Sequence, residues 1–340
     1  MKHHYSSYIS KRILLATILL LGCFESRVYG KTVHEDGLPS WNESPRKEQI
    51  VHFVNEVTDP LSSNFVAPED RIATFDNDGT LWVEKPMYTH LFAIFDRCRE
   101  LVAQNPDLKE IEPFKAIIKK DISYFSRLYE NHSLDTILGQ LLAVPFGGMT
   151  VKNYENWNQK WLNAWKHPRF KVGYKQLIYQ PMLELIQYLK ANDFQVYIFT
   201  ADEGSFLRLV SEDLYDIPSE RVQGSAIRLE YIPENGKSSL IRTYQAQYLN
   251  NWSAKPRLIN QVIGKRPILA AGNSNGDLEM LQFVDEQPNS LALLVRHTDA
   301  EREYQYDHHA EEVQSLANER GWVIVDMKDD WKSVFPSSLE

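Results

Sequence analysis

Five short apolar runs recur along the chain, and stretches with helical spacing of apolar residues lie between most of them. The runs cover Ile72–Asp76, Val196–Thr200, Pro267–Ala271, Leu291–Val295 and Trp322–Asp326. Their length and their content of β-branched and aromatic residues are typical of buried strands. Alternation of strands and helices predicts an α/β fold: a Rossmann-like parallel sheet with helices on both faces.

The segment between the first two runs has a different pattern. Residues 88–187 contain many apolar residues at helical spacing and no run that predicts a strand. We therefore predict a core made of residues 31–87 and 188–340, and a helical cap domain, residues 88–187, inserted into it. Ligands of open α/β sheets bind at the carboxyl ends of the strands, and a cap inserted after the first strand can cover that edge.

The amino terminus has the pattern of a secretory signal peptide. Residues 13–21 read ILLATILLL and follow three basic residues, and residues 1–22 contain no acid. The run is too short for a membrane span, which needs about 18 apolar residues. We predict a signal peptide over residues 1–30 and export to the periplasm or cell envelope. An alternative stays open: residues 20–23 resemble a lipobox, so cleavage before Cys23 would yield a lipoprotein anchored by that residue.

Charge and cysteine content exclude several classes of protein. The chain carries 37 basic and 46 acidic residues, a formal net charge of −9. A nonspecific nucleic-acid binder normally has the opposite sign, so no nucleic-acid partner is expected. Two cysteines, Cys23 and Cys98, are too few for a disulfide framework or for a metal site built from cysteine.

The most informative segment is DNDGTL, residues 76–81, directly after the first run. Asp76 and Asp78 are two residues apart at the end of a predicted strand, where their carboxylates can converge on a cation and a phosphate. Gly79 permits a tight turn and a close approach of the backbone. The alternative is a turn rich in Asp and Gly without a chemical role.

Three further segments follow in order. Thr200 ends the second run and precedes the acids Asp202 and Glu203. Lys255 precedes Pro256 at the predicted start of a helix, where a cation can meet phosphate charge, with Lys237 and Lys265 as alternatives.

The last segment, GNSNGD, covers residues 272–277 and follows the third run. Asn273 and Asp277 both offer oxygen atoms of the kind that Mg²⁺ prefers.

This ordered set resembles the haloacid dehalogenase-like superfamily, and most closely a phosphoserine-phosphatase-like bacterial branch of it. The segments LPSWN, FDNDGTLW, YQPMLEL, GNSNGDLEML, HTDAEREY and DMKDDW carry the resemblance to that branch. The resemblance implies a Rossmann-like core with an inserted helical cap. It departs from the usual pattern where Asn273 replaces an Asp, and where acids replace the glycines that usually follow Thr200.

The resemblance also implies residue roles. Asp76 and Asp78 would be catalytic, Thr200 and Lys255 would bind phosphate, and Mg²⁺ would be the cofactor. Its site would be formed by Asp76, Asp78, Asn273 and Asp277. Glu84 is either a solvated loop acid or a contact for a substrate amine.

The function implied is a Mg²⁺-dependent phosphatase that hydrolyses a small phosphomonoester through an aspartyl-phosphate on Asp76. The alternative is a non-catalytic protein that binds phosphate or a phosphopeptide, suggested by Asn273 and by the acids after Thr200. Two carboxylates placed at a phosphate argue against mere binding. The expected partner is a small phosphorylated substrate, and membrane contact would occur only through a lipid anchor at Cys23.

Overall fold

The computed structural model describes residues 37–121, 123–125, 134–234 and 237–336. The predicted signal peptide and the alternative anchor at Cys23 lie outside these residues. No helix in the described part of the chain has the length and apolar character needed to cross a membrane.

Within the described residues, eight strands form one sheet in the order β4-β3-β2-β1-β5-β6-β7, and β8 also pairs with β6. The strands are β1 Ile72–Phe75, β2 Gln195–Glu203, β3 Val222–Glu234, β4 Lys237–Tyr248, β5 Leu269–Gly272, β6 Leu291–Thr298, β7 Gln305–Tyr306 and β8 Val323–Asp326. The central strand β1 pairs in parallel with β2 and with β5. The predicted parallel sheet is confirmed, and antiparallel strands β4 and β7 extend it.

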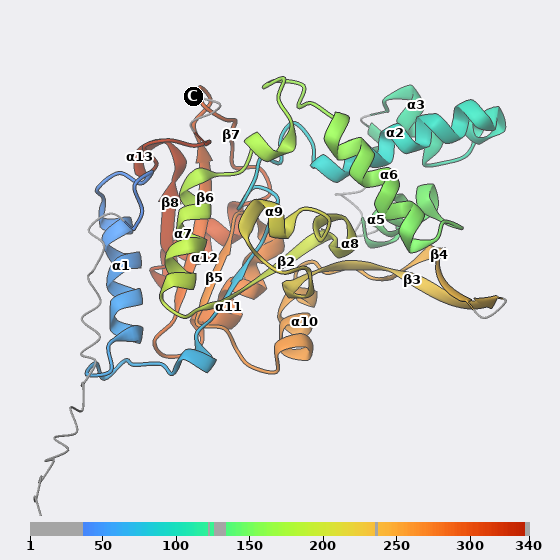
Figure 1. Ribbon diagram of the computed structural model, residues 1–340. Helices are drawn as coiled ribbons and strands as arrows, with labels where there is room; N and C mark the ends of the chain where they lie inside the picture. Colours follow the sequence, from blue (N-terminus) through green and yellow to red (C-terminus); the bar gives the residue numbers. More distant parts are fainter. Residues whose placement is uncertain (1–36, 122, 126–133, 235–236, 337–340) are drawn as a thin grey trace, which may run out of the picture. The chain divides into compact units, whose positions relative to one another are not determined.

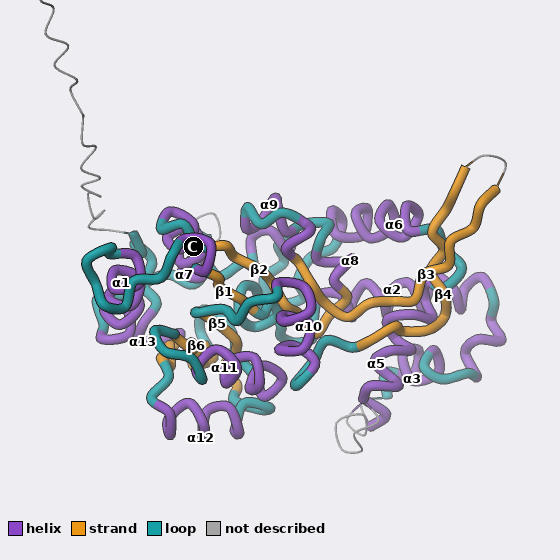
Figure 2. Tube along the Cα trace, turned by 90° about the horizontal axis from the view of Figure 1, so that it is seen from below, coloured by secondary structure: helices purple, strands orange, loops and turns teal. Residues whose placement is uncertain are grey.

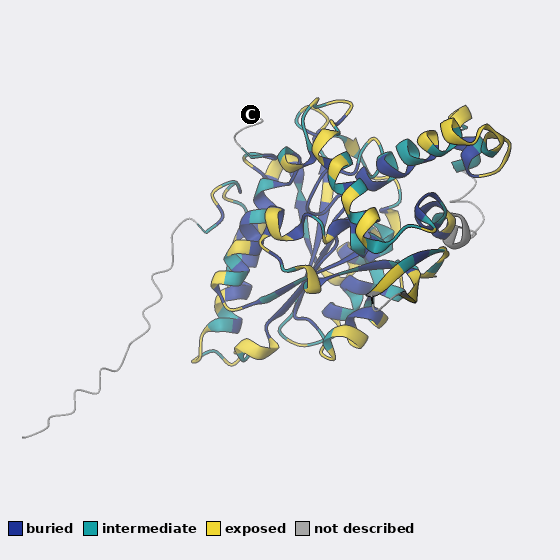
Figure 3. Cartoon of the chain, turned by 45° about the vertical axis from the view of Figure 1, so that its right-hand side comes forward, coloured by how far each residue is buried: buried dark blue, intermediate teal, exposed yellow. Residues whose placement is uncertain are grey.

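Helices cover both faces of the sheet (Figure 1). The core helices are α1 Pro45–Thr58, α7 Gln180–Ala191, α8 Gly204–Leu207, α9 Ser211–Tyr215, α10 Ala254–Ile263, α11 Leu278–Asp285, α12 Glu311–Arg320 and α13 Met327–Asp330. Successive strand residues point to opposite faces, so Leu269 and Ala271 pack in the cluster that includes α1 and α7. Ala270 packs in the cluster of α10, α11 and α12. Both faces of the strands are therefore buried, as the dark strands of Figure 3 show.

The helical insertion contains α2 Thr89–Gln104, α3 Phe114–Lys119, α5 Leu134–Ala143 and α6 Val151–Ala164. They share a separate apolar cluster that includes Ile94, Phe114 and Phe146. The boundary predicted at residue 187 falls inside α7. That whole helix packs with the core, because its apolar side, including Met182 and Leu185, lies in the sheet cluster.

The hairpin of β3 and β4 was not predicted. It runs from the sheet toward the cap helices (Figure 2), and Ile227 and Ala246 pack in the cap cluster. Residues 228–233 read RLEYIP and are all exposed; with two charged residues and a Pro they form no apolar run like those that predicted β1, β2, β5, β6 and β8. Glu234 pairs with Lys237, and the sequence between them is Asn235-Gly236, a dipeptide typical of two-residue hairpin turns. The hairpin could have been predicted from this dipeptide.

Candidate active site

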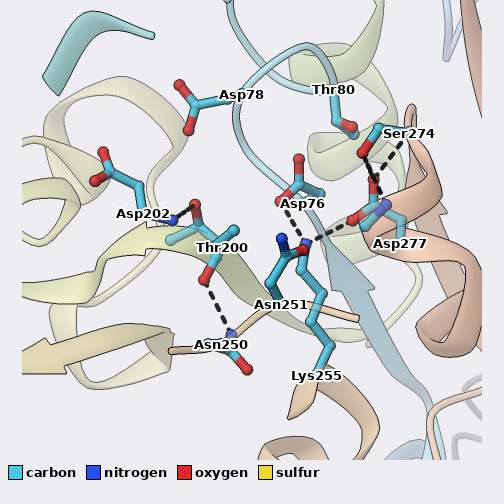
Figure 4. A network of polar contacts seen from close by, with 12 residues as sticks. Asp76, Asp78, Thr80, Thr200, Asp202, Asn250, Asn251, Lys255, Ser274 and Asp277 are labelled. Atoms are coloured by element: carbon cyan, nitrogen blue, oxygen red, sulfur yellow. Dashed lines mark hydrogen bonds and ion pairs between the residues drawn. The ribbon is translucent and has the colours of Figure 1, made fainter. Parts of the chain in front are cut away.

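The predicted site residues meet at the carboxyl edge of the sheet (Figure 4). Asp76 follows β1, Thr200 lies in β2, and residues 273–277 follow β5. These three strands are parallel neighbours, so their carboxyl ends share one edge. Lys255 reaches the same place from the first turn of α10.

Lys255 bridges two of the acids. Its Nζ atom lies 2.6 Å from Asp76 Oδ1 and 2.5 Å from Asp277 Oδ1, and the residue is 1% exposed. Burial alone would lower the pKa of Lys255, but Asp277 and Asp76 outweigh it and raise the pKa above its usual value. The ammonium is therefore charged. Of the alternatives, Lys265 pairs at the surface with Asp70 and Lys237 begins β4.

Asp277 fixes the loop that follows β5. Its Oδ2 atom accepts hydrogen bonds from the backbone N–H of Asn273 at 3.0 Å and of Ser274 at 3.1 Å. Because Oδ1 contacts Lys255, both oxygens of Asp277 already have partners. In this arrangement Asp277 positions Lys255 and the loop, and a direct bond to a metal would require it to give up one of those contacts.

The two acids of the DNDGTL segment have different surroundings. Burial and the charge of Asp277 raise the pKa of Asp76 to about 7, although Lys255 opposes them. The Asp78 carboxyl is turned toward Asp202 (Figure 4) and accepts a hydrogen bond from Trp82 Nε1 at 2.8 Å. Burial, then Asp202 and Asp76, raise the pKa of Asp78 well above its usual value. Asp78 is thus suited to hold a proton.

The turn after Asp78 requires glycine. Gly79 has φ +75°, and a Cβ atom at this position would lie 2.1 Å from Asn273 Nδ2 and 2.9 Å from Glu84 Cδ. His297 lies 2.8 Å from the Gly79 carbonyl oxygen through its Nε2 atom and 3.1 Å from Glu303 Oε2 through Nδ1. Because a carbonyl only accepts, Nε2 is the donor.

In the sequence His297 forms no recognisable ligand spacing with other residues, which indicated a surface histidine; this was wrong, because the residue is buried, at 3% exposed. Its position at the end of β6, on the same edge of the sheet, was the available signal.

Thr200 is buried beside this edge, and its Oγ1 accepts a hydrogen bond from the Asp202 N–H at 3.0 Å. Asn250 Nδ2 donates to the Thr200 carbonyl at 3.0 Å. These contacts fix the residue, while the proton of its hydroxyl can still be donated to a ligand oxygen.

The acids that replace the expected glycines are both paired. Asp202 Oδ1 lies 2.6 Å from Nδ1 of His90, a cap residue in α2. Both Glu203 oxygens accept from the Arg242 guanidinium, at 2.6 and 2.9 Å. Their charges are therefore directed to the cap and the hairpin. Neither of these partners of Asp202 and Glu203 could be recognised in the sequence, because His90 and Arg242 are far away along the chain.

Comparison with known proteins supports the fold. No protein-family model and no curated protein matches the chain. Among solved structures, a protein of unknown function from Bordetella pertussis matches with a TM-score of 0.50 at 13% identity, covering 76% of this chain and 98% of that one.

A functionally unknown protein from Anaerococcus prevotii has a TM-score of 0.48 at 12% identity, covering 80% of this chain and 89% of that one. A phosphoserine phosphohydrolase-like protein from Francisella tularensis has a TM-score of 0.40 at 15% identity, covering 72% and 99%.

The topology, with a helical insertion after β1 and the four segments at one sheet edge, is the arrangement that the motif resemblance predicted. The chain therefore has an α/β fold with a Rossmann-like core. Similarity at these identities concerns the fold alone.

The donors at this edge of the sheet suit a hard cation. Asp76 offers a carboxylate oxygen, Asp78 a main-chain carbonyl and Asn273 an amide oxygen, all ligands that Mg²⁺ accepts. Asp76 and Asp277 share the single ammonium of Lys255, so buried negative charge is in excess. Among the described residues no group of three or more Asp, Glu, His or Cys side chains could hold a metal ion by itself.

Proposed function

We propose that this protein is a Mg²⁺-dependent phosphatase that hydrolyses a small phosphomonoester through an aspartyl-phosphate intermediate. The observation that carries the proposal is the contact of buried Lys255 with Asp76 Oδ1 at 2.6 Å, at the strand edge where the Asp78 carboxyl is turned toward Asp202. The proposed nucleophile and acid, from one segment, thus lie at the same strand edge as a fixed cation from a distant part of the sequence.

In the proposed mechanism Lys255 holds one oxygen of Asp76, so the other oxygen attacks phosphorus. A covalent phosphoryl group forms on Asp76 while the bond to the leaving oxygen breaks, and Asp78 donates its proton to that oxygen. Asp78 then takes a proton from the water that hydrolyses the intermediate. Lys255 and Thr200 hold the phosphoryl oxygens.

Asp76, the Asp78 carbonyl and Asn273 would hold Mg²⁺, which neutralises phosphoryl charge when bound.

Phosphate release from a panel of small phosphomonoesters, measured with and without Mg²⁺, tests this proposal. Asp76→Asn should abolish turnover, and Asp78→Asn should lower kcat by about 10²–10⁴-fold. A chelator should stop the reaction. Asp213→Asn, which removes an exposed carboxylate on α9, is the matched control and should have no effect.

Turnover by Asp76→Asn at the rate of the natural protein would disprove the nucleophile, and activity that resists chelation would disprove the metal requirement. Phosphate binding without turnover at any Mg²⁺ concentration would favour the alternative, a non-catalytic phosphate-binding protein. Asp202 and Glu203, the acids that suggested that alternative, are paired with His90 and Arg242, so they give it less support.

The same proposal places the protein outside the cytoplasm, in the periplasm or cell envelope, on the basis of its amino-terminal sequence. Its partner there would be a small phosphorylated compound, with membrane contact only if Cys23 carries a lipid.

A further inference from the structure

Glu84 is a buried acid and not a solvated loop acid. It is 5% exposed, and its Oε1 atom accepts a hydrogen bond from Asn273 Nδ2 at 3.4 Å. The same Asn273 amide accepts a hydrogen bond at Oδ1 from the Thr80 hydroxyl at 3.2 Å. Both polar atoms of the Asn273 amide therefore have hydrogen-bond partners. Because a carboxylate only accepts, the amide nitrogen faces Glu84 and the amide oxygen faces Thr80.

Glu84 also lies against the backbone that follows Asp78. A Cβ atom at Gly79 would be 2.9 Å from Glu84 Cδ and 2.1 Å from Asn273 Nδ2. The Gly79 nitrogen belongs to the same peptide group as the Asp78 carbonyl. Glu84, Asn273 and that peptide thus form one compact group, in which two members are proposed metal donors.

The local charges make Glu84 and Asn273 a matched pair. The motif resemblance places an Asp where this chain has Asn273, but a carboxylate there would face the Glu84 carboxylate in a buried place, where like charges repel strongly. An amide at 273 instead donates to Glu84. The negative charge that the loop lacks at residue 273 is thus present at residue 84, with Lys85 Nζ 3.5 Å from it as a partly exposed counter-charge.

We propose that Glu84 is a positioning residue of the metal site: it orients the Asn273 amide and supplies the negative charge that Asn273 lacks. This inference rests on the proposed Mg²⁺-dependent function. Residues that orient metal ligands typically change metal affinity about 10–100-fold when they are replaced.

Mg²⁺ binding to the purified full chain, measured by titration calorimetry, tests the inference without any substrate. Glu84→Gln should weaken Mg²⁺ binding about 10–100-fold. The double variant Glu84→Gln with Asn273→Asp returns the charge to residue 273 and should recover most of that loss. A purely structural role of Glu84 would predict no such rescue.

Glu184→Gln is the matched control, because Glu184, on α7, is a carboxylate of similar burial, 6% exposed, that accepts a hydrogen bond from the Ser40 N–H. It should leave Mg²⁺ affinity unchanged. If Glu84→Gln does not fold, Glu84→Asp takes its place, and the shortened side chain should still weaken binding.

Unchanged Mg²⁺ affinity in the Glu84 variant, a double variant no better than Glu84→Gln, or a natural protein that binds no Mg²⁺ would each overturn the inference. Phosphate release is measured separately, so a protein that binds Mg²⁺ but has no phosphatase activity would disprove the proposed function and leave the role of Glu84 intact.

Discussion

At the scale of single residues, the three acids of the site have different surroundings. Asp277 accepts hydrogen bonds from two backbone N–H groups and contacts Lys255. Burial and the charge of Asp277 raise the pKa of Asp76 to about 7, and burial, then Asp202 and Asp76, raise the pKa of Asp78 well above its usual value. One residue type thus supplies a fixed anchor, the proposed nucleophile and the proposed proton donor.

Gly79 provides a test at this scale. Gly79→Ala should lower the free energy of unfolding by about 3 kcal/mol, which combines the strain of a positive φ with overpacking against Asn273. Gly264→Ala is the matched control: its φ is +71°, but a Cβ there meets nothing within 4 Å. It should cost only about 1 kcal/mol. Urea unfolding of both variants gives the comparison, and equal losses would contradict the proposed crowding at Gly79.

At the scale of elements, one buried ion pair joins strand, hairpin and cap. The Glu203 side chain at the end of β2 and Arg242 on β4 are each 2% exposed, and the Arg242 Cζ atom lies 3.8 Å from the centre of the Tyr154 ring on α6. The hairpin therefore does more than extend the sheet. It carries Arg242, whose positive charge pairs with Glu203, the acid three residues after Thr200.

Breaking this pair should be costly, and removing both charges should cost less. Glu203→Gln and Arg242→Met should each lower the free energy of unfolding by about 3–5 kcal/mol, because each leaves a buried charge without its partner. The double variant should lose clearly less than the sum of the single losses. A double-mutant cycle from denaturant unfolding measures this, and simple additivity would show that the two side chains do not stabilise each other.

At the scale of the whole molecule, residues Asp36–Glu340 form a compact unit of their own. The first described helix, α1, is part of that unit, because Ile50 and Val54 are fully buried in the cluster against the sheet. The apolar residues 13–21 lie outside the described residues.

A chain that lacks residues 1–30 should melt within about 2 °C of the full-length protein, because all the packing of the core remains. Removal through residue 58, which takes α1 as well, is the control and should prevent stable folding.

Intact mass of protein recovered from a bacterial cell envelope should correspond to cleavage after residue 30, or to a lipid-modified chain that begins at Cys23. Recovery of the uncleaved chain from the cytoplasm would contradict the export prediction.

The sequence by itself determined the layered α/β core, the helical insertion and the candidates Asp76, Asp78, Thr200, Lys255, Asn273 and Asp277, since apolar periodicity and strand-end motifs are local patterns. Local patterns cannot say which distant side chains become neighbours. Only the tertiary structure decided that Lys255 bridges Asp76 and Asp277, that Arg242 and His90 take up the charges of Glu203 and Asp202, and that buried Glu84 faces Asn273. Those pairings depend on burial, which makes an unpaired charge too costly to leave alone.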